Sequence, residues 1–201
     1  MNTFDPYDFA GHLTEAQQTV LREQAEQREQ RFIAKRPMRF AAEGDLHPDI
    51  HQWCRRVYRG TEHGDLVLFG GVGAGKTWSL WKLGQLLIQN GWRGRYEVLE
   101  SYDLKDVMRD RDRDQDARVL VNTWTQADLL AIDDLGVVGM HNWDSDNLSR
   151  LINERWKNGL PTVVTTNVAD LKPLVGPRAA SRMQDEATFV AMGDNDRRRN
   201  K

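Results

Sequence analysis

The stretch that decides the fold is Gly70-Gly71-Val72-Gly73-Ala74-Gly75-Lys76-Thr77. It fits the phosphate-binding loop pattern G-x-x-x-x-G-K-[ST] at every fixed position. Its glycines let the backbone curl so that N–H groups converge on phosphate oxygens. In such a loop the lysine, here Lys76, bridges the β- and γ-phosphates, and the hydroxyl of Thr77 binds Mg²⁺. Residues 70–77 therefore predict a nucleoside triphosphate site that uses ATP and Mg²⁺.

The residues on both sides of this loop support the prediction. Leu66-Val67-Leu68-Phe69 is a short apolar run of the kind found in buried strands. Thr77 to Asn90 has the composition of a helix, and its N-terminus would face the phosphates. Strand, loop and helix in this order are the setting that the pattern requires.

The composition limits the classes of protein to consider. A chain of 201 residues can hold one full α/β domain with a short extension. Its net charge of −2 means that any nucleic-acid binding must be local. The single cysteine, Cys54, excludes an intramolecular disulfide framework. Neither a signal peptide nor a run of about 18 apolar residues is found, so we expect a cytoplasmic protein with no membrane contact.

The chain is expected to divide at residue 45. Thr14 to Arg36 is rich in Gln, Glu and Arg and predicts a helix that ends at Pro37. Its apolar positions are too sparse for a helix that folds alone, so it must dock on a partner or on its own domain. We expect residues 1–45 to be a helical partner-binding extension and residues 46–201 to be the ATPase domain.

Residues 49–58, which follow Pro48, predict a short helix. After this helix, predicted helices alternate with apolar runs. Helices are predicted at 76–90, 102–112, 117–126 and 144–158, and strands at 65–69, 94–100, 128–132, 161–166 and 187–192. This alternation indicates a parallel sheet with helices on both faces.

Two carboxylates follow the apolar run Leu129-Leu130-Ala131-Ile132. An acid at this strand end holds Mg²⁺ beside the loop hydroxyl in phosphate-loop enzymes, and we assign this role to Asp133. Asp134 is the candidate general base that orients the attacking water.

Two further candidates come later in the chain. Asn167 ends the run Pro161–Thr166, where an amide can hold the attacking water, although Asn is also a common turn residue. Arg182 follows Arg178 on a predicted short helix. An arginine that completes the γ-phosphate site of a neighbouring subunit would explain its type and position, but spacing alone favours a surface arginine.

In order along the chain, these segments resemble the AAA+ ATPases of the DnaC/IstB group. The resemblance covers about residues 60–198 and rests on the following motifs: Gly70–Thr77, Leu129–Gly136, Asn153-Glu154-Arg155-Trp156, Pro161–Asn167, Arg178 with Ser181-Arg182-Met183, and Asp196-Arg197. It implies a five-stranded P-loop sheet in the order 5-1-4-3-2 without a full C-terminal lid. It also implies that Asn167 is the sensor-1 residue, that Arg182 is the arginine finger, and that Arg178 supports the same subunit junction.

The resemblance further implies what the protein does. It favours a slow ATPase, stimulated by DNA or by self-association through the ATP site, that loads a hexameric replicative helicase onto single-stranded DNA through residues 1–45. An IstB-like transposition helper and a nucleotide-gated adaptor with little turnover are the alternatives. Asp134 stands where many relatives have Glu, which shortens the carboxylate by one methylene.

Other features leave their interpretations open. In the loader branch, the region after the second strand contacts single-stranded DNA. In this chain the positive charges of the Lys and Arg side chains in residues 101–125 are nearly cancelled by Asp side chains. A solvated helix and a DNA contact are therefore equally favoured. A basic tail, Arg197-Arg198-Arg199 with Lys201, is better explained as a solvated terminus. His47, His51 and Cys54 lack a clear fourth ligand for zinc. Of the tryptophans, Trp78, Trp81 and Trp156 are expected in the core, and Trp124 and Trp143 either pack or contact DNA bases.

Overall fold

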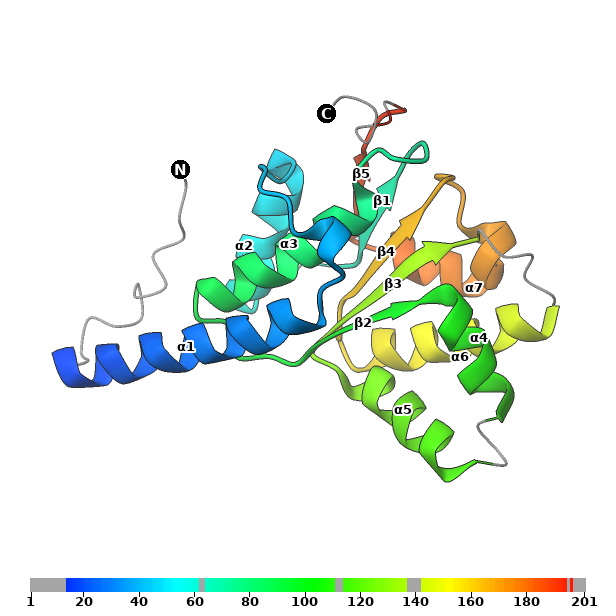
Figure 1. Cartoon of the computed structure of the whole chain (residues 1–201). Coiled ribbons are helices and arrows are strands. Elements are labelled where there is room, and N and C mark those ends of the chain that lie inside the picture. The colour runs from blue at the N-terminus through cyan, green and yellow to red at the C-terminus, as the bar shows by residue number, and fades with distance from the viewer. Residues whose placement is uncertain (1–13, 62–63, 111–113, 137–141, 195, 197–201) are drawn as a thin grey trace.

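Five parallel strands form a single sheet in the order β2-β3-β4-β1-β5 in the computed structural model, which describes residues 14–61, 64–110, 114–136, 142–194 and 196 (Figure 1). The strands are β1 (Leu66–Phe69), β2 (Tyr96–Glu100), β3 (Leu129–Leu135), β4 (Thr162–Thr166) and β5 (Thr188–Ala191). The expected order 5-1-4-3-2 is confirmed, because it is the same order in the opposite direction.

Helices cover both faces of this sheet (Figure 1). They are α1 (Glu15–Lys35), the short 3-10 helix η1 (Met38–Phe40), α2 (Pro48–Arg59), α3 (Lys76–Gln89), α4 (Ser101–Asp110), α5 (Gln115–Gln126), α6 (Asn142–Lys157) and α7 (Lys172–Gln184). The helices α1, α2 and α3 lie over one face, and α4 to α7 lie over the other. Each predicted strand and helix exists, with boundaries shifted by a few residues. None of the described helices is both long enough and apolar enough to cross a membrane.

The strands β1 and β3 begin with apolar runs because helices cover both faces of the sheet there. In β1, Leu66 and Leu68 face the α2–α3 side, and Val67 faces the opposite side. The same alternation separates Ala131 from Ile132 in β3. This is the pattern of a parallel sheet enclosed on both faces.

The second half of α1 packs on its own domain. Phe32 is buried, with its ring centroid 5.3 Å from that of Trp81 and 5.6 Å from that of Tyr96. Gly84 permits this approach, since a Cβ there would lie 2.7 Å from the Phe32 ring and 2.3 Å from the Tyr96 ring. The first half of α1 is largely exposed, including Val20 at 50%.

A buried arginine on α6, Arg155, connects the end of α5 with the start of β4. Arg155 is 0% exposed and donates to the main-chain carbonyls of Trp124 (2.7 Å), Ala127 (2.8 Å) and Pro161 (2.6 Å). It also donates to the Thr162 hydroxyl at 3.1 Å. The planar, multi-donor guanidinium suits this set of acceptors better than a lysine would. Arg155 is therefore a structural residue of the core.

Candidate nucleotide site

The predicted phosphate loop lies where β1 ends and α3 begins. Lys76 is 6% exposed, and its ammonium donates to the carbonyls of Gly70 (2.7 Å) and Gly71 (2.8 Å). The same ammonium donates to Oδ1 of Asn167 at 2.9 Å. The adjacency of β1 and β4 in the sheet brings Asn167 to the loop, as the expected strand order required. Lys76 and Asn167 thus form one polar cluster at the carboxyl edge of the sheet.

Thr77 and Asp133 meet beside this cluster. The Thr77 hydroxyl donates to Oδ1 of Asp133 at 3.1 Å, and the Thr165 hydroxyl donates to the same oxygen at 2.5 Å. Burial raises the pKa of Asp133, bonds from Thr165 and Thr77 oppose the rise, and the neighbouring carboxylate of Asp134 adds to it. A hydroxyl and a carboxylate oxygen at this separation are hard ligands of the kind that Mg²⁺ prefers, so the residues fit the ion.

Asp134 is turned away from its neighbour by an irregularity in β3. The pairing of β3 with β4 shifts register between Ile132 and Leu135, and Asp134 has a φ of 54°. This left-handed conformation is uncommon outside glycine, although Asp tolerates it better than most residues. It is held by bonds from the Asp134 N–H to the Thr165 hydroxyl (2.8 Å) and from the Ser101 hydroxyl to the Asp134 carbonyl (2.9 Å). As a result, Asp133 is buried against Thr77, whereas Asp134 is exposed in the cleft.

A cleft of about 770 Å³ lies over the loop. Its phosphate end is lined by Val72 to Thr77, with Asp134 and Asn167. Its other wall is a segment that we call the strap, residues 39–45, together with Trp78. The volume is in the range of small-molecule sites and accommodates a nucleotide.

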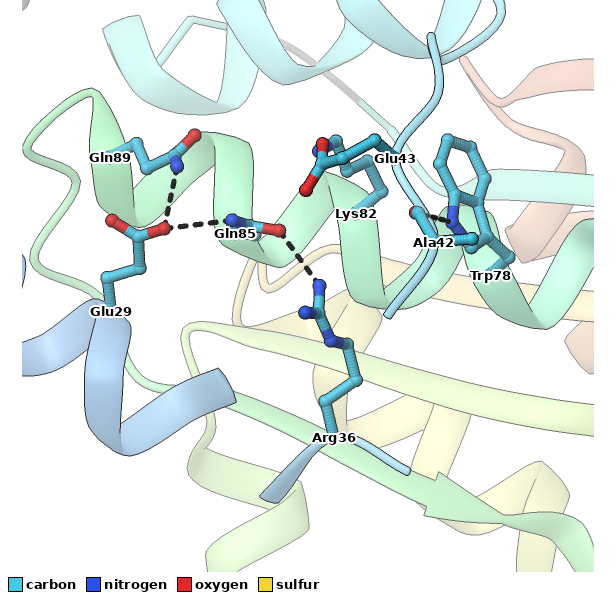
Figure 2. A network of polar contacts seen from close by, with 8 residues as sticks. All are labelled: Glu29, Arg36, Ala42, Glu43, Trp78, Lys82, Gln85 and Gln89. Carbon is cyan, nitrogen blue, oxygen red and sulfur yellow. Dashed lines mark hydrogen bonds and ion pairs between the residues drawn. The ribbon is translucent and has the colours of Figure 1, made fainter. Parts of the chain in front are cut away.

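The strap is attached to α3, the helix that begins at the phosphate loop (Figure 2). The Trp78 indole N–H donates to the Ala42 carbonyl at 2.8 Å, and Lys82 pairs with Glu43 at 2.8 Å. Gly44 lies against the Trp78 ring, since a Cβ there would approach it to 3.2 Å. The strap had been expected within the partner-binding extension, and its place in the cleft was missed.

A second polar group ties α1 to the same helix (Figure 2). Arg36 donates to the Gln85 side-chain oxygen at 3.0 Å. Glu29 accepts from Gln85 at 2.8 Å and from Gln89 at 2.6 Å. The helix α1, the strap and α3 are therefore connected to one another on the same face of the sheet.

The end of β5 also reaches the phosphate loop. The Gly71 N–H donates to the Gly193 carbonyl (3.0 Å) and to the Asp194 carboxylate (3.1 Å). Gly73 lies against Asp196, whose carboxylate oxygen would be 2.0 Å from a Cβ at that position. Asp196 had been connected with the site only through the resemblance, and its partner in that motif, Arg197, lies outside the described residues.

Arg182 and Arg178 are not among the residues that line this cleft. Since β4 and β5 are parallel, α7 must return to the amino edge of the sheet, and Arg182 lies in its last turn. A kink at Gly176 (φ 79°), followed by Pro177, begins the short helix that carries both arginines. Arg178 is exposed, and Arg182 is partly buried against α6. Arg182 therefore does not join the phosphate site of its own chain.

The chain matches the IstB-like ATP binding protein family over residues 7–172. It belongs to that family. No curated protein matches the sequence.

The fold of this IstB-like chain recurs in solved structures. A DnaC helicase loader is similar with a TM-score of 0.62 and 20% identity, over 74% of this chain and 93% of that one. DnaI has a TM-score of 0.63 and 19% identity, over 81% and 94%. AMPPCP-bound DnaA from Aquifex aeolicus has a TM-score of 0.60 and 17% identity, over 75% of this chain and 47% of that one. This chain thus spans about half the length of DnaA and nearly all of the DnaC and DnaI structures.

The tryptophans of this IstB-like chain are divided between the core and the surface. Trp124 is a buried packing residue, but Trp156 is 45% exposed and was wrongly expected in the core. Trp78 and Trp81 are half-buried. No group of three or more His, Cys, Asp and Glu side chains able to hold a metal occurs among the described residues, which include His47, His51 and Cys54.

The predicted DNA-contacting region forms α4 and α5. Arg118 is exposed on α5, next to the exposed apolar residues Val119 (58%) and Leu120 (42%). The side chains of Lys105 and Arg109, like residues 111–113 and 197–201, lie outside the described part of the structure. The side chain of Trp143 is outside it as well. A DNA contact at this region stays a prediction.

Proposed function

We propose that this chain is a slow ATPase that loads a hexameric replicative helicase onto single-stranded DNA. The observation that carries the ATPase is the cluster at the carboxyl edge of the sheet, where Lys76 contacts Asn167 and Thr77 contacts Asp133. The family match supports ATP binding, and the similarity to a DnaC helicase loader over nearly its full length favours a loader.

Each residue of the cluster has a role in ATP hydrolysis. Lys76 and the loop N–H groups bind the phosphates, and Thr77 and Asp133 hold Mg²⁺, which would neutralise the charge on the phosphate oxygens. Asp134, exposed in the cleft, accepts a proton from the attacking water, and Asn167 orients that water without adding charge. Thr165 supports both acids through its hydroxyl.

Arg182 completes the ATP site of a second copy of the chain, with Arg178 at the same junction. The basis is its position, since α7 carries it to the edge of the sheet opposite its own phosphate loop. An arginine supplied by a neighbour stabilises the charge of the transition state, so hydrolysis depends on assembly.

The helicase contact is assigned to the exposed first half of α1, within residues 1–45. Val20 offers an apolar side chain on a helix whose other end is fixed to α3. Because the strap lines the cleft, removing all 45 residues would also damage the nucleotide site, so point variants are the appropriate probe.

The test is affinity capture from native cell extract with the tagged full-length chain, with ATP and with ADP. We expect a replicative helicase, recovered more strongly with ATP, and its loss in Val20→Glu with unchanged ATP affinity. Gln30→Glu, at another exposed position of α1, is the matched control. Recovery of no helicase would contradict the proposal.

A transposition helper is the second candidate, and the family match to IstB-like proteins favours it. In that case the same capture would recover a transposase, and the ATPase would respond to double-stranded DNA more than to single strands. A nucleotide-gated adaptor would change conformation with ATP and release no phosphate with either single-stranded or double-stranded DNA.

A further inference from the structure

Arg182 is held by two side chains of α6. Its Nη1 donates to Oδ1 of Asn153, and its guanidinium carbon lies 4.4 Å from the ring centroid of Trp156. Asn153 and Trp156 are three residues apart, so they present neighbouring side chains on one face of the helix. One contact fixes the end of the guanidinium, and the other fixes its plane.

The position of Trp156 is not explained by packing. Leu151, Ile152 and Arg155 attach this part of α6 to the core and are at most 3% exposed, whereas Trp156 is 45% exposed. A tryptophan at such a surface has a favourable use when its face covers an arginine. Met183, next to Arg182, is buried and anchors the end of α7.

This arrangement restricts a side chain that would otherwise sample many rotamers. Arginine has a large rotamer entropy, and fixing the side chain in advance reduces the entropy that is lost on binding. Within the described part of the chain, Asn153 is the only hydrogen-bond acceptor of Arg182, so most of its five N–H groups are available to an incoming anion.

We propose that Asn153 and Trp156 are positioning residues that orient Arg182 for insertion into the ATP site of a second copy of this chain. This inference rests on the proposed function, because it requires Arg182 to act on a neighbour. The ligand of the oriented guanidinium is the γ-phosphate of the ATP held by that neighbour.

The experiment is a mixed-subunit ATPase assay with full-length chains and single-stranded DNA. Lys76→Ala subunits cannot bind ATP but carry an intact Arg182, so they serve as donors. Arg182→Ala subunits bind ATP but lack the arginine, so they serve as acceptors. Each alone should be inactive, and an equal mixture should recover about a quarter of the wild-type rate, since random mixing produces that share of intact junctions.

We expect Asn153 and Trp156 to be needed only in the donor subunit, which supplies Arg182. A Lys76→Ala donor that also carries Trp156→Ala or Asn153→Ala should lower the recovered rate about tenfold or more, because misplacement of a reacting group by an ångström is that costly. Trp156→Phe in the donor should retain most of the rate, since an aromatic face remains. Glu154→Ala, an exposed position on the same helix, is the control donor and should recover the full mixed rate.

The same substitutions in the acceptor separate positioning from damage to the fold. An Arg182→Ala acceptor that also carries Trp156→Ala should work as well as the simple acceptor. Equal loss on both sides, or no loss in the donor, would overturn the inference while leaving the shared site intact. No recovery in the simple mixture would instead refute the action of Arg182 on a neighbour, and the inference with it.

Discussion

Asp65, just before β1, is partly buried, and its carboxyl group is therefore costly to ionise. Its Oδ1 accepts the Thr162 N–H at 2.7 Å. Burial raises its pKa from an ordinary 3.8 to about 7, although the bond from Thr162 and the charge of Arg155 oppose the rise. The folded protein therefore binds more protons than the unfolded chain between these two values. This contribution to stability is complete below about pH 3.8 and is lost as the pH rises through about 7.

Asp65→Asn should remove this pH dependence. Asn keeps an oxygen for the Thr162 N–H and has no charge to bury. Relative to the variant, we expect the wild type to lose about 2–3 kcal/mol of unfolding free energy between pH 5 and pH 8. Urea unfolding at several pH values measures it, and Glu26→Gln, on the exposed side of α1, is the control. Parallel pH profiles for wild type and Asp65→Asn would refute the assignment.

Arg155 is the residue whose loss should harm the fold most. Arg155→Met leaves the carbonyls of Trp124, Ala127 and Pro161 buried without their donor. Each buried acceptor left unsatisfied costs about 1–3 kcal/mol, so we expect a total loss of several kcal/mol. Denaturant unfolding should show this loss, whereas Arg150→Met, at an exposed position of the same helix, should change stability little. A loss below about 1 kcal/mol would show that water satisfies these carbonyls.

At the scale of elements, Gln85 is the junction between α1 and α3. It accepts from Arg36 and donates to Glu29, so it fixes the end of α1 next to the strap (Figure 2). Gln85→Leu should break both bonds and loosen α1 and the strap that follows it. We expect faster proteolysis within α1 and severalfold weaker ATP binding, since each lost bond is worth about 1 kcal/mol.

Two comparisons make this test specific. Gln30→Leu adds a similar apolar side chain at an exposed position of α1 and should leave both measurements unchanged. Saturating ATP should slow the proteolysis of the wild type, because a ligand that contacts the strap stabilises its ordered form. If α1 is cleaved equally fast in wild type and Gln85→Leu, the bonds seen in Figure 2 do not hold the helix.

The elements themselves could be predicted from the sequence because their signals are local. The glycine-rich loop, the apolar strands and the residues Asp133 and Asn167 at strand ends are each visible within a few positions. The strap was missed because nothing in residues 39–45 marks a cleft wall; only the folding of α1 back onto α3 places it there. Thr165 was missed because a threonine in a buried strand has the same pattern whether it packs or supports a carboxylate.

The contacts between α6 and α7 at the surface could not be predicted from the sequence for a related reason. Trp156 was expected in the core because a tryptophan on a helix usually packs inside. Its helical phase relative to Arg155 decides otherwise, since Arg155 is 0% exposed and the next residue faces outward. A buried arginine beside an exposed tryptophan reverses the usual preference, and no periodicity based on hydrophobicity alone would show it.

For the whole molecule, the two halves of the proposed ATP site lie at opposite edges of one sheet. The phosphate loop is at the carboxyl edge, and Arg182 is at the amino edge. We expect the contact that joins them to be a head-to-tail interface, which uses two different surfaces of identical chains. Such interfaces generate rings or open helical assemblies and never a closed two-fold dimer.

The proposed head-to-tail completion of the site would make ATPase activity depend on protein concentration. Dilute chains lack a neighbouring Arg182, so the ATPase rate per subunit should rise at least tenfold from the dilute to the assembled range. Sedimentation velocity with ATP should show species larger than a dimer over the same range. Arg182→Ala should bind ATP with wild-type affinity and keep a low rate per subunit at every concentration. A wild-type rate per subunit that is already maximal for the monomer would show that each chain carries a complete site, and would refute the head-to-tail mechanism.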